Sequence, residues 1–362
     1  MLPSRLAAPS PPSSVTPDAA VRSTDSDALL SRVSCHSLGY FNDPDGLLFL
    51  SPAQRRSSER RPPLINIGTH ARCWAVDQLV QQHVGAQNSS TQPVQVLSLG
   101  AGTDSRFWRL RRQAEQQGWE WKCRRWVEVD FAEATGAKAR TVSGKAELKS
   151  RLGGDVKVEL GGQGLTSPLY ALLPGDLRSL PSLSQLLSPP PSSPSSSEPI
   201  LDPTLPTLLL LECVSVYLDP SVTDALLGWF ASTFGASGSA VVGYDPYALD
   251  DAFGQVMKRN LAMRNLSLPG AASTPSLASL TDRLRRNGLK GTCGALSVRE
   301  IRERCVPVEE NERVAKLEPL DEVEELNLVL EHYAVSWGNV CSDDAVEEGD
   351  GGIGLRERET GE

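Results

Sequence analysis

Glycine and acidic residues follow a series of apolar runs in this sequence, and together they could hold a nucleoside. The turn Gly100–Gly102 ends one run, Asp130 ends a second, and Glu212 follows four consecutive leucines. A further turn carries Asp176 and Leu177. Glycine lets the backbone approach a ligand closely. A carboxylate can accept hydrogen bonds from both ribose hydroxyls, and an acid beside an apolar residue can bind and pack adenine. These residues therefore predict a nucleoside-containing cofactor.

Taken singly, each of these residues has a more ordinary explanation. A glycine after a strand is often only a tight turn, Asp176 could be a turn aspartate, and Asp130 could cap a following helix. Glu212 is harder to explain, because a carboxylate after an apolar run is costly unless it is paired or solvated. A dinucleotide-binding turn would favour a third glycine where Ser105 stands. This difference favours S-adenosylmethionine over NAD.

Arg72 is a second candidate for binding. It heads a row with Val76 and Val80 in a helix predicted over Thr69–Val84, so it should point along the core. A guanidinium group matches a carboxylate through a fork of donors. The partner could be the carboxylate of the cofactor's methionine moiety, that of a substrate, or an acidic side chain of the protein itself.

Strand-like and helix-like segments alternate along the chain. Apolar runs predict strands at 94–99, 126–130, 207–211, 239–244 and 333–337, and apolar residues at helical spacing separate several of them. Asp219 and Pro220 form a helix start. The alternation predicts an α/β fold with a doubly wound, mostly parallel sheet, extra N-terminal helices and a C-terminal helical and strand addition. Ligands of such sheets bind at the carboxyl ends of the strands, where the acids stand.

The composition argues against several other classes of protein. A net charge of −9 lowers the expectation of nucleic-acid binding. No apolar run approaches the roughly 20 residues of a membrane span, and we expect no secretory signal, because the first residues lack a long apolar stretch. Seven cysteines and four histidines show no metal-ligand spacing, so we predict no metal site and a cytoplasmic protein with reduced thiols.

Three segments are too rich in Pro, Ser, Gly or acidic residues to predict a packed structure. Residues 1–22 and a Pro/Ser insertion at 182–203 are expected to be disordered, and residues 342–362 form an acidic, flexible tail. Strand-like sequence lies on both sides of the insertion, so it should be a surface loop. A single domain is therefore expected over residues 23–341.

Longer motifs occur in order along the chain and carry a resemblance to a known family. They are Ser37–Pro44, Ile65–Arg72, Ser98–Asp104, Phe107–Leu110, Glu128–Phe131, Gly175–Arg178, Glu212–Tyr217, Asp251–Met257 and Leu320–Glu322. Together they resemble leucine carboxyl methyltransferases over about residues 23–337. Each motif is moderately specific, whereas the ordered set is highly specific.

The resemblance implies a class I, Rossmann-like, S-adenosylmethionine-dependent methyltransferase. Its expected reaction is methyl esterification of the C-terminal leucine α-carboxylate of the type-2A protein phosphatase catalytic subunit, by a monomer. A carboxylate is already anionic at neutral pH, so positioning replaces a catalytic base. Tyr217 would line the substrate pocket. The residues that the resemblance assigns to the cofactor are Arg32, Arg72, Gly100, Asp130, Asp176, Leu177 and Glu212.

Three alternatives remain at the level of sequence. A related methyltransferase of wybutosine synthesis in tRNA would need a further C-terminal domain, and a small-molecule O-methyltransferase is possible. A catalytically silent phosphatase-binding protein would keep the fold and lose the cofactor. The joint presence of Arg72, Gly100, Asp130, Asp176 and Glu212 argues against that third alternative.

Overall fold

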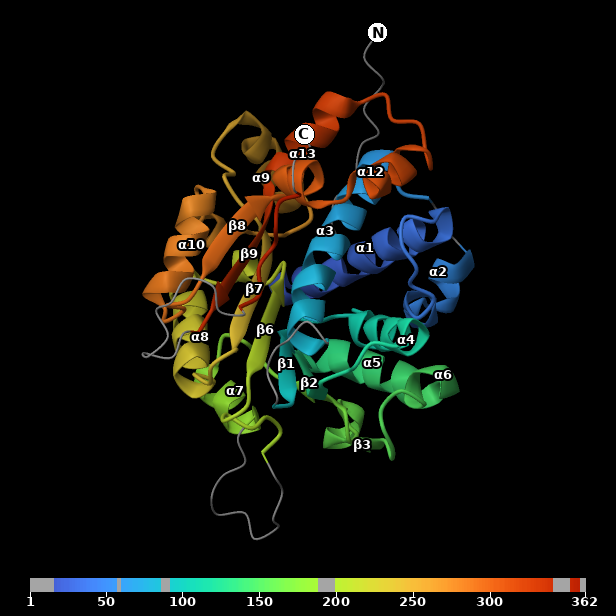
Figure 1. Cartoon of the computed structure of the whole chain (residues 1–362), viewed down its shortest axis with the longest axis vertical. Helices are drawn as coiled ribbons and strands as arrows, with labels where there is room; N and C mark the ends of the chain where they lie inside the picture. The colour runs from blue at the N-terminus through green and yellow to red at the C-terminus, as the bar shows by residue number, and fades with distance from the viewer. Residues whose placement is uncertain (1–15, 57–59, 86–91, 188–198, 341–351, 359–362) are drawn as a thin grey trace.

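A mixed nine-stranded sheet runs through the described part of the chain (Figure 1). The computed structural model describes residues 16–56, 60–85, 92–187, 199–340 and 352–358. The strand order is β3-β4-β5-β2-β1-β6-β7-β9-β8. The strands are β1 (Val94–Leu99), β2 (Cys123–Asp130), β3 (Lys157–Glu159), β4 (Gly164–Thr166), β5 (Tyr170–Pro174), β6 (Thr207–Glu212), β7 (Ala240–Pro246), β8 (Cys293–Ser297) and β9 (Tyr333–Asn339).

The five central strands, from β5 to β7, are parallel, in agreement with the mostly parallel sheet that the sequence predicts, although β5 was not among the predicted strands. Every residue of β1 is buried, which explains why its sequence is apolar without clear alternation. The chain moves outward from β1 to β2 and β5, and then returns to the other side of β1 with β6 and β7. This reversal between β1 and β6 creates a crevice at the carboxyl ends of the two strands.

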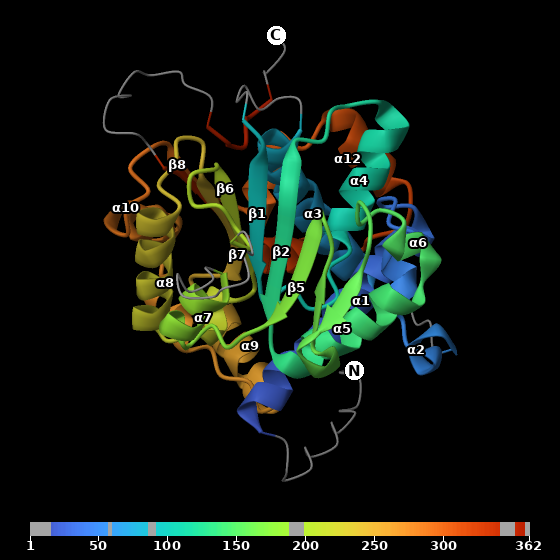
Figure 2. The same ribbon diagram turned by 90° about the horizontal axis from the view of Figure 1, so that it is seen from below.

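Helices cover both faces of the sheet (Figure 2). On one face, α3, α4 and α5 pack against Val94 and Val96 of β1. On the other, α7, α8 and α10 pack against Leu97 and Leu99 of the same strand. The helices are α1 (Pro17–Leu38), α2 (Pro52–Arg56), α3 (Pro63–Val84), α4 (Arg106–Gln117), α5 (Ala132–Gly144), α6 (Ala146–Lys149), α7 (Leu180–Leu187), α8 (Pro220–Thr233), α9 (Ala252–Ala262), α10 (Leu277–Arg286), α11 (Val298–Glu300), α12 (Val308–Ala315) and α13 (Val323–Glu331).

The expected N-terminal and C-terminal additions are present. The helices α1, α2 and α3 precede the first strand, and α11, α12 and α13 lie between β8 and the last strand. Because α13 and α11 both pack against α3, the N-terminal and C-terminal additions contact each other. The helix start at Asp219 is confirmed: its carboxylate accepts a hydrogen bond from the N–H of Ser221 at 2.9 Å. None of the described helices is both long and apolar enough to cross a membrane.

Two of the expected disordered segments begin or end in ordered helix. The N-terminal boundary at residue 22 is wrong, because α1 begins at Pro17 and Thr16 caps it by accepting from the N–H of Ala19 at 3.3 Å. The insertion boundary at 182 is also wrong, because Leu183 and Leu187 of α7 are buried against the sheet. Residues 1–15 and 188–198 lie outside the described residues.

The acidic tail is also partly ordered, contrary to expectation. Ile353 is 5% exposed, and its backbone N–H and carbonyl both bond to the side chain of Asn339 on β9, at 2.9 and 3.0 Å. The backbone of Gly354 makes a similar pair of bonds with Gln82 on α3. An apolar residue inside a polar tail therefore anchors residues 352–358; residues 341–351 and 359–362 lie outside the described part.

Candidate cofactor site

A cavity of about 450 Å³ lies at the carboxyl ends of the parallel strands. The turn after β1 and the ends of β2, β5 and β6 form one wall, and α1 and α3 supply much of the rest. Every residue that the sequence assigned to a site lines this one cavity: Arg32, Arg72, Gly100, Asp130, Asp176, Leu177, Glu212 and Tyr217. Among the described residues, no group of three or more His, Cys, Asp or Glu side chains could hold a metal ion.

The turn after β1 requires glycine at two positions. Gly100 has φ +65° and Gly102 has φ +46°, a region that other residues rarely adopt. A Cβ atom on Gly100 would lie 2.6 Å from Cγ2 of Val214, and one on Gly102 would lie 2.3 Å from Oδ1 of Asp25. The two glycines therefore let α1 and the segment after β6 close around the turn.

Asp130 secures the same turn from the neighbouring strand. Its Oδ2 accepts a hydrogen bond from the N–H of Gly102 at 2.8 Å, and its Oδ1 accepts one from the N–H of Phe131 at 2.6 Å. Burial raises the pKa of Asp130 above its ordinary value, against the lowering effect of these two bonds. The carboxylate is held at the cavity wall, where it can accept further hydrogen bonds.

Asp176 and Leu177 form the outer rim of the cavity. Hydrogen bonds from the Arg178 guanidinium lower the pKa of Asp176. Arg178 also donates two bonds of 2.9 Å to Asp18 on α1, so the rim is tied to the first helix. The ring of Phe131 contacts two guanidinium groups, with the Cζ atoms of Arg22 and Arg178 5.5 and 5.6 Å from its centroid.

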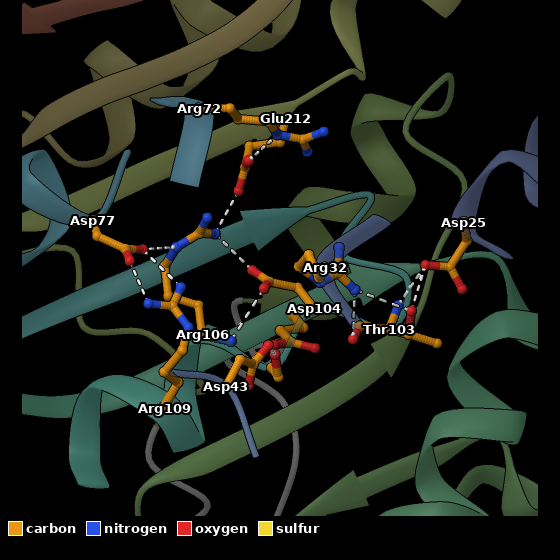
Figure 3. A network of polar contacts seen from close by, with 12 residues as sticks. Asp25, Arg32, Asp43, Arg72, Asp77, Thr103, Asp104, Arg106, Arg109 and Glu212 are labelled. Atoms are coloured by element: carbon orange, nitrogen blue, oxygen red, sulfur yellow. Dashed lines mark hydrogen bonds and ion pairs between the residues drawn. The ribbon is translucent and has the colours of Figure 1, made fainter. Parts of the chain in front are cut away.

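Glu212 forms ion pairs with two arginines. Nε of Arg72 donates to Oε2 of Glu212 at 2.9 Å, and Arg106 donates to Oε1 (Figure 3). Burial alone would raise the pKa of Glu212, but Arg106 and Arg72 outweigh it and hold the pKa below its usual value. The intramolecular pair considered for Arg72 is therefore present, while its side chain, 21% exposed, still faces the cavity.

Arg106 connects this pair to a buried ionic network that the sequence analysis missed. It is 2% exposed and also donates to Asp104 at 2.6 Å and to Asp77 at 2.8 Å (Figure 3). Arg109, one turn further along α4, donates to the same Asp77. A signal existed in the sequence, since both arginines flank buried aromatic residues in a helix that should bury its apolar face.

Arg32 reaches the cofactor turn from α1. Its Nη2 donates to the carbonyl of Thr103 at 3.0 Å and to its hydroxyl at 3.2 Å. Asp25, two turns earlier in α1, accepts from the N–H and the hydroxyl of the same Thr103 at 2.8 and 2.7 Å. Arg32 and Asp25 therefore fix the turn itself, and Asp25 was not predicted.

Part of the cavity lining is apolar and aromatic. Burial raises the pKa of Tyr217 to about 12, so this phenol is neutral at physiological pH. Tyr217 follows the strained Cys213, which has φ +54° directly after Glu212. The other apolar and aromatic residues of the lining include Leu64, Tyr244, Leu261, Val298, Leu330 and Tyr333.

The strand order and the cavity at the strand ends define the α/β, Rossmann-like fold of class I methyltransferases. A family model described as leucine carboxyl methyltransferase matches residues 20–231, and the chain belongs to this family. A leucine carboxyl methyltransferase 1 of Cryptococcus neoformans is 42% identical, over 93% of this chain and 97% of that protein.

Relatives from plants and animals have similar coverage. The leucine carboxyl methyltransferase 1 homolog of Arabidopsis thaliana is 33% identical, over 88% of this chain and 89% of that protein. Leucine carboxyl methyltransferase 1 of Rattus norvegicus is 32% identical, over 88% and 90%. The resemblance inferred from the ordered motifs is thus confirmed, and the protein is a methyltransferase of this family.

Proposed function

We propose that this protein transfers a methyl group from S-adenosylmethionine to the α-carboxylate of a C-terminal leucine. The proposed acceptor is the tail of the type-2A protein phosphatase catalytic subunit. The observation that carries this proposal is the pairing of Arg72 with Glu212 in the wall of one cavity that has both polar and apolar lining residues. Membership of the leucine carboxyl methyltransferase family supports methyl transfer to a leucine carboxylate.

The polar residues that line the cavity fit S-adenosylmethionine. Asp130, at the end of β2, has acceptor capacity for ribose hydroxyls, and Asp176 with Leu177 suits an adenine edge and face. Arg72 would hold the methionine carboxylate, and Glu212 would lie near the positive amino and sulfonium groups. Gly100 lines the cavity without a side chain, so the nucleoside could approach the backbone of this turn closely.

When bound, S-adenosylmethionine supplies an electrophilic methyl group on a positively charged sulfur. The protein's task is then alignment of the acceptor oxygen with the methyl–sulfur bond, since the acceptor carboxylate needs no deprotonation. The carboxylate oxygen gains the methyl, and the bonding pair returns to sulfur, which leaves a methyl ester and a neutral thioether. The chain needs no general base for this step.

The electrostatics of the cavity suit an anionic nucleophile. Glu212 balances Arg72 and Arg106, so neither guanidinium acts as an isolated cation that would bind the acceptor oxygen too tightly. The apolar lining residues Leu64, Leu261 and Leu330 suit a leucine side chain and would exclude water from the acceptor oxygen. A partly dehydrated carboxylate is a stronger nucleophile than a fully hydrated one.

A labelling experiment tests the proposal. The protein is incubated with methyl-labelled S-adenosylmethionine and the phosphatase catalytic subunit, with and without its terminal leucine. We expect label only on the intact subunit, and its release as methanol in mild base, because esters hydrolyse there. Base-stable label would exclude a carboxyl ester. Label on the truncated subunit would exclude the terminal leucine as acceptor, and binding without any label would favour a silent phosphatase-binding protein.

A further inference from the structure

The guanidinium group of Arg72 rests on side chains of two neighbouring strands. Glu212 of β6 and Tyr244 of β7 are register partners in a parallel pair, so their side chains lie next to each other. Nε of Arg72 donates to Glu212 at 2.9 Å. The Cζ atom of Arg72 lies 4.4 Å from the centre of the Tyr244 ring, within the range of a cation–π contact.

A second tyrosine supports the first from the next strand. The rings of Tyr244 and Tyr333 are stacked, with centroids 5.5 Å apart and planes 11° apart. In the antiparallel pair of β7 and β9, Tyr244 lies opposite Val335, so Tyr333 is its diagonal neighbour on the same face. Three adjacent strands therefore present one carboxylate and two stacked rings beneath Arg72.

We propose that Tyr244, supported by Tyr333, is a positioning residue that orients Arg72 toward the cofactor. The ring fixes the plane of the guanidinium group, and Glu212 fixes its rotation within that plane through Nε. Within the described part of the chain, no hydrogen bond engages Nη1 or Nη2, and Arg72 lines the cavity. This inference rests on the proposed function, in which these two nitrogens bind the methionine carboxylate.

An aromatic ring suits this position better than a second acid. A carboxylate in the place of Tyr244 would compete with the cofactor's carboxylate for Nη1 and Nη2. The face of a tyrosine ring attracts the cation without accepting strong hydrogen bonds from those nitrogens, and it costs little desolvation. Tyr244 is 7% exposed, so solvent screens the contact weakly.

Ligand binding can isolate this role from activity. Isothermal titration compares S-adenosylhomocysteine, which has the amino-acid carboxylate, with 5′-methylthioadenosine, which lacks it. We expect Tyr244→Leu to weaken S-adenosylhomocysteine binding about tenfold and to change methylthioadenosine binding less than twofold, because only the first ligand uses Arg72. Tyr244→Phe keeps the ring, and should retain most of the affinity for S-adenosylhomocysteine.

Tyr247→Leu is the matched control, since Tyr247 is equally buried at 7% but does not line the cavity. It should leave both affinities unchanged. If Tyr244→Leu does not fold, Tyr333→Leu replaces it, with an expected two- to threefold loss for S-adenosylhomocysteine alone. Equal losses for the two ligands, or no loss for S-adenosylhomocysteine, would overturn the inference. Failure of the unmodified protein to bind S-adenosylhomocysteine would instead refute the proposed function.

Discussion

Arg106 is the residue that links the cofactor cavity to the core. Its three carboxylate partners lie on three separate elements: Asp77 on α3, Asp104 in the turn after β1, and Glu212 at the end of β6. All three acids are at most 13% exposed at their side chains. Arg106 therefore joins three buried acids and, together with Arg72 and Arg109, offsets charges that would otherwise repel one another inside the protein.

Replacement of this residue should be severely destabilising. We expect Arg106→Met to lower the free energy of unfolding by about 3–5 kcal/mol, because Asp104 loses its side-chain ion pair while Asp77 and Glu212 keep only one arginine each. Urea denaturation monitored by circular dichroism measures the change. Arg285→Met is the control, since Arg285 is 55% exposed and its pair with Asp282 contributes about 1 kcal/mol or less. Equal effects of the two substitutions would show that the network does not stabilise the fold.

The same network determines whether the stability of the protein rises or falls in acid. Burial opposes the charged form of Asp104, yet Arg106 and Arg32 outweigh it, and the pKa of Asp104 lies well below its ordinary value. The pKa of Glu212 is lowered as well. Their stabilisation is therefore present above the unfolded-state pKa values and is lost as the pH falls through the folded ones.

Asp245 should show the opposite dependence. Burial raises its pKa to about 7, against the bonds from Ser215 and the N–H of Val216. Its contribution is complete below pH 4 and is lost as the pH rises toward 7. We expect the stability of Asp245→Asn relative to the unmodified protein to increase by about 4 kcal/mol between pH 4 and pH 8. Urea titrations at both pH values test this, and a constant offset would contradict it.

The sequence could reveal site residues in two ways. Gly100, Asp130 and Glu212 were found at the ends of predicted strands, because strand ends of a parallel sheet meet at one edge. Arg72 was found at the head of an apolar row in a predicted helix. Arg106 and Tyr244 were missed for a shared reason: their roles depend on partners from distant elements. A buried arginine in an apolar helix is visible in the sequence, but its three acids are not.

At the scale of elements, α1 packs against the glycine turn that follows β1 and holds it in place. Asp25 and Arg32 both hold Thr103, and Asp25 occupies the space that a Cβ on Gly102 would need. Because α1 precedes the sheet in the chain, a generic Rossmann-like core would lack these contacts. The turn therefore depends on a helix that precedes the first strand of the sheet.

Two glycine substitutions separate this contact from backbone strain. Gly102→Ala and Gly118→Ala both force a non-glycine residue into positive φ, at about 1 kcal/mol each. Only a Cβ at Gly102 meets Asp25, since nothing lies within 4 Å of one at Gly118. We expect Gly102→Ala to weaken S-adenosylhomocysteine binding at least tenfold in titration calorimetry, and Gly118→Ala to leave it unchanged. Similar affinities for both variants would refute the role of α1.

The elements that the sequence predicted are those with strong apolar runs. The strands at 94–99, 126–130, 207–211, 239–244 and 333–337 are present with small changes of boundary. The central strand β5, the short β3 and β4 and the edge strand β8 were missed. In β8, Cys293–Ser297, glycine and alanine have low strand propensity, and pairing with β9 determines the conformation. Tertiary contacts overrode a weak local preference.

At the scale of the whole molecule, the segment 352–358 forms hydrogen bonds with both β9 and α3. Ile353→Ala should lower the free energy of unfolding by about 2–4 kcal/mol, because it removes buried methyl groups beside Asn339. Glu357→Ala is the control, with a side chain 61% exposed and an expected change within about 0.5 kcal/mol. Denaturation curves for both variants measure the difference, and similar values would mean that the segment does not stabilise the domain.

The cavity wall also has a consequence for the order in which the protein is made. Its residues extend from Asp18 on α1 to Tyr333 on β9, and α13 contributes Leu330. During synthesis on the ribosome, the chain emerges from its N-terminus, so the glycine turn and Glu212 are available long before β9. Until then β7, whose residues are all buried in the finished sheet, has an exposed apolar edge. A chain that stops before β9 would lack part of the cavity wall and would leave the edge of β7 unpaired. We expect such a chain to be degraded by proteases before it could bind a nucleoside.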